Sequence, residues 1–238
     1  MKLKNLFIWL SLFSIAMGFL ESSVVIYLRE ILYPEGFSFP LAIMEGSLAV
    51  TEILREAATI IMLISVAVIA GKSFSVRFAW FIYCFAIWDI SYYIFLKVLI
   101  NWPSSFFEWD ILFLLPVTWT GPVISPLMVS VLMIILSAVI LYHLDRGVPT
   151  RLKLREWLML VGGAVIVIFA FSLDFSSFIL DRYSPADIWN MPIRGSVLEY
   201  ARGYIPGRFN WWLFSAGNVL IIFAILMLAR RLNGLRHQ

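Results

Sequence analysis

Three charged residues stand at the head of a run that is otherwise apolar enough to cross a membrane. Residues 51–59 read TEILREAAT, and residues 60–70 contain no charge. On a helix, Glu52 and Glu56 would share a face because they are four residues apart, and Arg55 lies three residues from Glu52. Carboxylates beside a guanidinium inside a membrane could bind a cation, a proton or a polar solute, or could supply an acid and a base.

Ionisable residues recur inside the other apolar runs of the sequence. Asp89, Tyr93 and Lys97 follow one another at intervals of four, so they would share one helix face. A charge exposed to lipid at the membrane centre costs at least about 2.5–3.5 kcal/mol, so we expect these side chains to point into the bundle. We predict a polar layer in the outer half of the membrane, formed by Glu21, Glu52, Arg55, Glu56, Asp89, Tyr93 and Asp174. The rim of this layer would carry Arg29, Lys97 and Arg202.

Arg55 is the fixed positive charge of the predicted layer, which otherwise carries five carboxyl groups. Two interpretations follow from this. In the first, Arg55 organises a site that binds a ligand. In the second, Arg55 ties helices together through Glu21 and Glu56, and Asp89 hydrogen-bonds a hydroxyl group on a neighbouring helix. The sequence leaves both interpretations open.

The composition is that of a polytopic membrane protein. The chain has 238 residues, of which 62% are hydrophobic and 14% are charged, whereas a soluble domain is nearer half apolar and a quarter charged. Runs of about twenty apolar residues mark transmembrane helices. We predict an all-α, polytopic integral membrane protein, with a single transmembrane domain over residues 1–238 and an uncleaved first helix. The six predicted spans are 5–28, 48–70, 77–100, 122–143, 157–179 and 210–230.

The basic residues favour one side of this topology. Of the 18 Lys and Arg residues, eleven lie near the termini and in or beside the short connections 71–76 and 144–156, together with two acidic residues. The positive-inside rule places this side in the cytoplasm. We therefore expect both termini to be cytoplasmic, in a plasma or inner membrane. The longer connections, 29–47, 101–121 and 180–209, would lie outside.

Two of the outer connections carry signals for short interfacial helices. Ser105 and Glu108 have the spacing of a capping box ahead of an apolar run, and Ser196 and Glu199 repeat that spacing before Arg202. We predict an interfacial or re-entrant helix in the first connection, and a short surface helix bearing Arg202 in the second.

Several classes of site lack the residues that they need. His143 and His237 are the two histidines and Cys84 is the single cysteine, which argues against a zinc centre and against a haem held by histidines. The sequence has neither a G-x-S-x-G elbow nor a glycine-rich phosphate loop. No cofactor is evident, although an all-oxygen cluster would suit a bound cation such as H⁺, Na⁺, Mg²⁺ or Ca²⁺.

Three function hypotheses follow. The first is transport or binding of a cation, a proton or a small polar solute at an outward-facing carboxylate and arginine site. The second is an enzyme that acts on a lipid or lipid-linked substrate at the outer leaflet, with Asp89 and either Glu52 or Glu56 as acid and base. The third is an accessory subunit of a membrane complex. The lipid bilayer is the expected partner in each case, other membrane subunits or further copies of the chain are compatible partners, and no nucleic acid is expected.

Overall fold

Six long helices form the protein, and each is long and apolar enough to cross a membrane. The computed structural model describes residues 3–40, 42, 44, 46–114, 117–186 and 195–236. The six helices are α1 (Leu3–Leu32), α2 (Gly46–Ala70), α3 (Phe74–Ile100), α4 (Ile124–Asp145), α5 (Leu154–Leu180) and α8 (Trp211–Arg236). The smaller elements are the strands β1 (Trp109–Phe113) and β2 (Trp119–Pro122) and the short helix α7 (Gly195–Ala201). The predicted all-α, multi-pass architecture is confirmed, since each predicted span coincides with one of the long helices.

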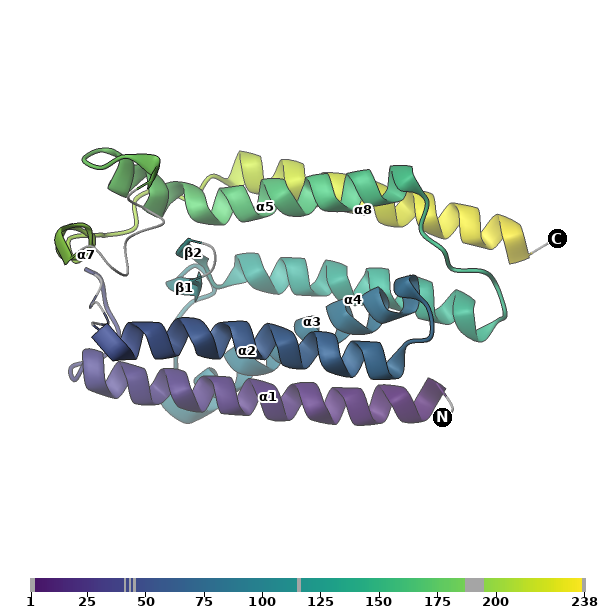
Figure 1. Cartoon of the computed structure of the whole chain (residues 1–238), viewed down its shortest axis with the longest axis horizontal. Helices are drawn as coiled ribbons and strands as arrows, with labels where there is room; N and C mark the ends of the chain where they lie inside the picture. Colours follow the sequence, from purple (N-terminus) through teal and green to yellow (C-terminus); the bar gives the residue numbers. More distant parts are fainter. Residues whose placement is uncertain are drawn as a thin grey trace.

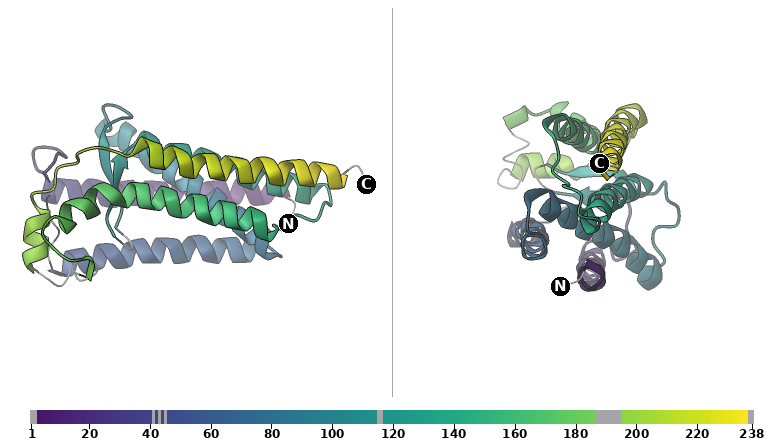
Figure 2. Two further views of the ribbon diagram at one scale, coloured as in Figure 1. Left: turned by 90° about the horizontal axis from the view of Figure 1, so that it is seen from above. Right: turned by 90° about the vertical axis from the view of Figure 1, so that its right-hand side faces the viewer.

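The long helices run side by side as a bundle with both termini at one end (Figure 1). Closely packed pairs build it: α1 packs on α3, α3 on α4, and α5 on α8, while α2 packs against α3. Seen end-on, α1 and α8 lie on opposite sides of the bundle (Figure 2). We call the end with the strands and α7 the loop end, and the opposite end the termini end.

The predicted interfacial helix in residues 101–121 is wrong, because this connection forms an antiparallel hairpin of β1 and β2. Ser105 and Glu108 do not begin a helix. The Glu108 carboxylate instead accepts hydrogen bonds from the backbone N–H and the hydroxyl of Ser104, at 2.6 and 2.8 Å, and closes a turn. The segment WDILF is rich in residues that favour strands, and pairing with β2 satisfies backbone groups that a helix would have satisfied internally. The other predicted surface helix is present as α7, directly before Arg202.

Close packing of α5 on α8 depends on two facing glycines, Gly163 on α5 and Gly217 on α8. A Cβ atom added at Gly163 would lie 2.6 Å from Cγ1 of Ile221 and 2.8 Å from the carbonyl oxygen of Gly217. A Cβ atom added at the adjacent Gly162 would meet only Leu220, at 3.5 Å, which is ordinary contact. Small residues of this kind let transmembrane helices approach closely, and van der Waals packing then holds them together.

We expect Gly163→Ala to destabilise the bundle and Gly162→Ala to leave it unchanged or slightly more stable. Gly163→Ala forces α5 and α8 apart, and an overpacked site of this kind costs about 1–3 kcal/mol of stability. Both substitutions raise the helix propensity of α5 by the same amount, about 1 kcal/mol. Thermal unfolding of the two purified variants in one detergent checks this. Equal shifts in Tm would contradict a tight contact at Gly163.

Candidate functional site

A cavity of about 380 Å³ opens within the bundle, and the polar residues of the loop-end half converge on it. Its lining comes from α1, α2, α3, α4, α5 and α8 and from the hairpin. The volume falls in the range of small-molecule sites. The ionisable residues on its lining are Glu21, Arg29, Glu52, Arg55, Glu56, Asp89, Tyr92, Tyr93 and Asp110, along with Tyr33 at the loop end.

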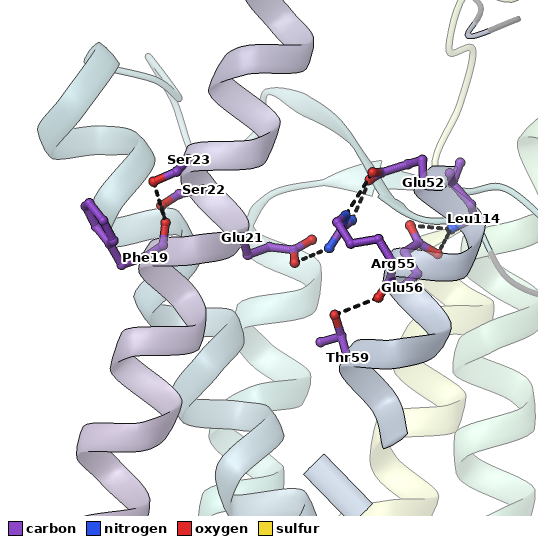
Figure 3. Close-up of polar contacts among 9 residues, drawn as sticks. All are labelled: Phe19, Glu21, Ser22, Ser23, Glu52, Arg55, Glu56, Thr59 and Leu114. Carbon is purple, nitrogen blue, oxygen red and sulfur yellow. Dashed lines mark hydrogen bonds and ion pairs between the residues drawn. The ribbon is translucent and has the colours of Figure 1, made fainter. Parts of the chain in front are cut away.

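Arg55 joins α1 to α2 at the wall of this cavity (Figure 3). Its guanidinium forms an ion pair with Glu21 of α1. It also binds Glu52 through two hydrogen bonds, of which Nε to Oε2 measures 2.8 Å. All the nitrogens of Arg55 are thereby engaged, and such bidentate, charge-assisted contacts are geometrically specific. Glu52, rather than Glu56, is its second partner.

Glu56 lies one helical turn beyond Glu52, and its carboxylate faces the end of the hairpin (Figure 3). Both of its oxygens accept the backbone N–H of Leu114, at 3.2 and 3.0 Å. Glu56 is only 6% exposed. Within the described part of the chain, no cation forms an ion pair with it, because Arg55 is already engaged by two other carboxylates.

Asp89, on α3, also has an uncharged hydrogen-bond partner, as Glu56 does. The Ser130 hydroxyl of α4 donates a hydrogen bond to Oδ2 of Asp89 at 2.8 Å, which is the contact to a neighbouring helix that the second interpretation foresaw. Asp89 is half-buried and also lines the cavity. Among the residues that the structure describes, no cation pairs with its carboxylate. The cavity therefore holds a buried carboxyl group, Glu56, and a half-buried one, Asp89, and both have uncharged hydrogen-bond donors as partners.

The loop end of the cavity is held by a buried cluster around Asp110. Nη2 of Arg29 lies 3.1 Å from Oδ1 of Asp110, and the Tyr93 hydroxyl donates to Oδ2 at 3.2 Å. The Arg29 guanidinium lies over the rings of both Phe37 and Trp102, with Cζ 4.3 and 3.8 Å from their centroids. Burial raises the pKa of the Asp110 carboxyl, and the attraction of Arg29 opposes that rise. This cluster fixes β1 to α1 and α3.

Some of the predicted layer and rim residues lie apart from the cavity. Asp174 accepts the Tyr204 hydroxyl at 2.7 Å and backbone N–H groups of Gly207 and Arg208 at 3.1 and 3.2 Å, so it orders the segment that leads into α8. Lys97 donates to the carbonyl oxygen of Pro103 at 3.0 Å. The ion pair between Arg202 and Glu199, at 3.1 Å, lies on the surface. Arg29 is not at the rim at all, since it is buried in the Asp110 cluster.

Sequence reasoning missed Asp110 and Tyr92, which both line the cavity. The expected helix placed Asp110 on an interfacial surface, whereas β1 buries it to 2% exposure. The charge of Asp110 within the otherwise apolar segment WDILF could have indicated a buried polar contact. Tyr92 was visible beside Tyr93, but its position depends on how α3 is rotated against α1 and α4.

The carboxyl groups of Glu56 and Asp89 give the cavity a place for a positively charged group. Across the described ranges, no group of three or more His, Cys, Asp or Glu side chains is placed to hold a metal ion. Two carboxyl groups with hydroxyl and amide partners could instead bind a proton or an ammonium group. Comparisons with protein families, with curated proteins and with solved structures found no match for this chain.

Proposed function

We propose that this multi-pass membrane protein binds, and carries into the membrane, a solute that bears a positively charged group. The observation that carries the proposal is that Glu56 and Asp89 line one cavity without a cationic partner among the described residues. A buried carboxylate without a countercharge is costly. A cationic ligand, or protons in its absence, would supply the missing charge.

The charges around the cavity favour a cation over an anion. Its lining carries five carboxyl groups, Glu21, Glu52, Glu56, Asp89 and Asp110, and two guanidinium groups, Arg29 and Arg55. Both guanidinium groups already form ion pairs. An anion would therefore meet an excess of negative charge, and each guanidinium group already neutralises carboxylates of its own.

We further propose that the loop end faces the outside of the cell. The basic residues gather around the termini end, and the positive-inside rule assigns such an end to the cytoplasm. Glu56 and Asp89 would then lie in the outer half of the membrane.

The test is equilibrium binding of n-hexylammonium to the full chain in lipid nanodiscs, with 1-hexanol as the uncharged control. We expect hexylammonium to bind and each of Glu56→Gln and Asp89→Asn to weaken it about tenfold to 150-fold, since a hydrogen bond to a charged group contributes about 1.5–3 kcal/mol. Both substitutions preserve shape and hydrogen bonding while removing the charge.

Glu199→Gln is the matched control, because Glu199 lies on α7 at the same end and its side chain is 70% exposed. That variant should bind like the unaltered chain. Folded variants of Glu56 and Asp89 that retain full binding, or a chain that binds no ammonium ion, would overturn the proposal.

An enzyme that acts on a lipid at the same cavity is the second candidate, and the apolar inner part of the cavity favours it. Because Glu52 is committed to Arg55, the acid and base would be Asp89 and Glu56. The subunit hypothesis is less attractive, because the polar side chains line a cavity instead of an outer face where a partner helix would dock.

A further inference from the structure

The cavity is much longer than a small cation requires. Along α3 its lining extends from Tyr93, near the loop end, to Phe78, near the termini end. These residues are fifteen positions apart, which corresponds to about 22 Å at the helical rise of 1.5 Å per residue. The charged residues occupy only the loop-end part of this length.

The rest of the cavity is apolar. Beyond Asp89 and Ser130, the described residues on its lining towards the termini end have apolar side chains, apart from Trp88 with its indole N–H. Contributions come from α3, α4, α5 and α8, represented by Phe78, Ile82, Leu132, Leu136, Leu160 and Ile221. We call this part the chain chamber. A water molecule needs about two to four polar partners, and a lining with one indole N–H suits an alkyl chain better than a solvated solute.

The chain chamber reaches the lipid-facing surface beside α5. Ala164 lines the cavity and is itself exposed, although it lies in the middle of a transmembrane helix. On the other side of the cavity, α2 contributes Glu52, Arg55 and Glu56 to the lining, all from its loop-end half. Because α2 packs on α3 and α5 packs on α8, α2 and α5 belong to different packed pairs of the bundle, and both line the cavity.

We propose that the ligand is a single-chain amphiphile with an ammonium head, and that it enters from the membrane between α2 and α5. Its head would lie at Glu56 and Asp89, and its alkyl chain would fill the chain chamber. The position of the ammonium head rests on the proposed function. The alkyl chain and the entry route go beyond it. Moving an alkyl chain from lipid into the chain chamber gains little free energy, because lipid is as apolar as the chamber. The alkyl chain would therefore determine the position of the ligand more than its affinity.

Photo-crosslinking of the full-length protein in nanodiscs tests this directly. The probe is dodecylammonium that carries a diazirine at the end of its alkyl chain. We expect labelled peptides to include residues of the chain chamber such as Ile82, Leu136 or Leu160. Excess dodecylammonium should abolish this labelling, whereas dodecanol and dodecyl sulfate should not. Labelling confined to lipid-facing residues such as Val165, or equal competition by all three compounds, would overturn the inference without any variant being needed.

A pair of substitutions on α5 separates the chain chamber from the head site. Ala164→Trp fills the opening and should reduce chamber labelling at least fivefold, while Val165→Trp, at a neighbouring residue that is 58% exposed, should leave it unchanged. Both variants are compared as folded protein. Unaltered chamber labelling in folded Ala164→Trp would refute the route, whereas failure of hexylammonium to bind the unaltered protein would refute the proposed function itself.

Discussion

Replacing Arg55 with methionine is expected to cause the largest loss of folded protein of any single substitution near the cavity. Arg55 is the shared partner of Glu21 and Glu52, whose side chains are only 15% and 9% exposed. Removing the guanidinium leaves two neighbouring buried carboxylates without a countercharge. Breaking a buried ion pair in this way costs about 3–5 kcal/mol, and like charges add to that cost. The yield of monodisperse protein in size-exclusion chromatography, with Tm in detergent, measures it.

The triple variant Glu21→Gln, Glu52→Gln, Arg55→Met distinguishes the two roles of Arg55. The triple variant keeps similar side-chain volumes and leaves no buried charge without a countercharge, which is the costly outcome of the single substitution, so we expect it to recover most of the folded yield. If it also binds hexylammonium, Arg55 fastens α1 to α2 and Glu56 and Asp89 hold the ligand. A triple variant that folds but does not bind would assign Arg55 to the site. A single Arg55→Met variant with unchanged Tm would contradict its structural importance.

The second large effect is expected from Asp110→Asn. This substitution keeps the shape of the side chain but leaves the Arg29 guanidinium, which is 8% exposed, without an anion. At about 3–5 kcal/mol for a broken buried pair and about 2–4 °C per kcal/mol for a chain of this size, Tm should fall by roughly 10 °C. The hairpin should also become more sensitive to protease, because Asp110 fixes it to α1 and α3.

Glu108→Gln provides the matched control in the same hairpin. Burial would raise the pKa of Glu108, but hydrogen bonds from Ser104 and from the Trp102 indole outweigh burial and lower it. The Glu108 carboxylate is thus held by neutral donors near the surface, and its substitution strands no buried cation. We expect a change in Tm well below that of Asp110→Asn. Equal losses from the two variants would mean that the Arg29–Asp110 pair does not hold the hairpin.

The six spans could be predicted because their length and composition are properties of each segment alone. Burial of backbone in lipid forces such segments into helices whatever their neighbours are. The hairpin could not be predicted in the same way. Trp109–Phe113 becomes a strand only because Trp119–Pro122 pairs with it, and the spacing of Ser105 and Glu108 fits a turn as well as a helix cap.

The polar layer was predicted by depth, and depth alone does not decide which side chains meet. Asp174 was expected at a depth similar to that of Glu21, yet its carboxylate accepts hydrogen bonds from Tyr204 and from the segment before α8. The i, i+4 relation of Glu52 and Glu56 correctly places both on one face of α2, and the i, i+3 spacing of Glu52 and Arg55 is that of the ion pair they form. The partner of Glu56 comes from elsewhere in the chain, because its carboxylate accepts the backbone N–H of Leu114. That contact depends on the hairpin, which no local pattern indicated.

The most direct measurement of the central claim is the distance between the ligand nitrogen and the two carboxyl groups. Solid-state NMR dephasing between ¹⁵N-hexylammonium and ¹³C-carboxyl-labelled protein in bilayers reports it. We expect dephasing that corresponds to a nitrogen within about 4 Å of a carboxylate oxygen, the usual ion-pair distance, and we expect its loss in the double variant Glu56→Gln, Asp89→Asn. Dephasing that is absent from the unaltered chain, or that persists in the folded double variant, would contradict a cation site formed by Glu56 and Asp89.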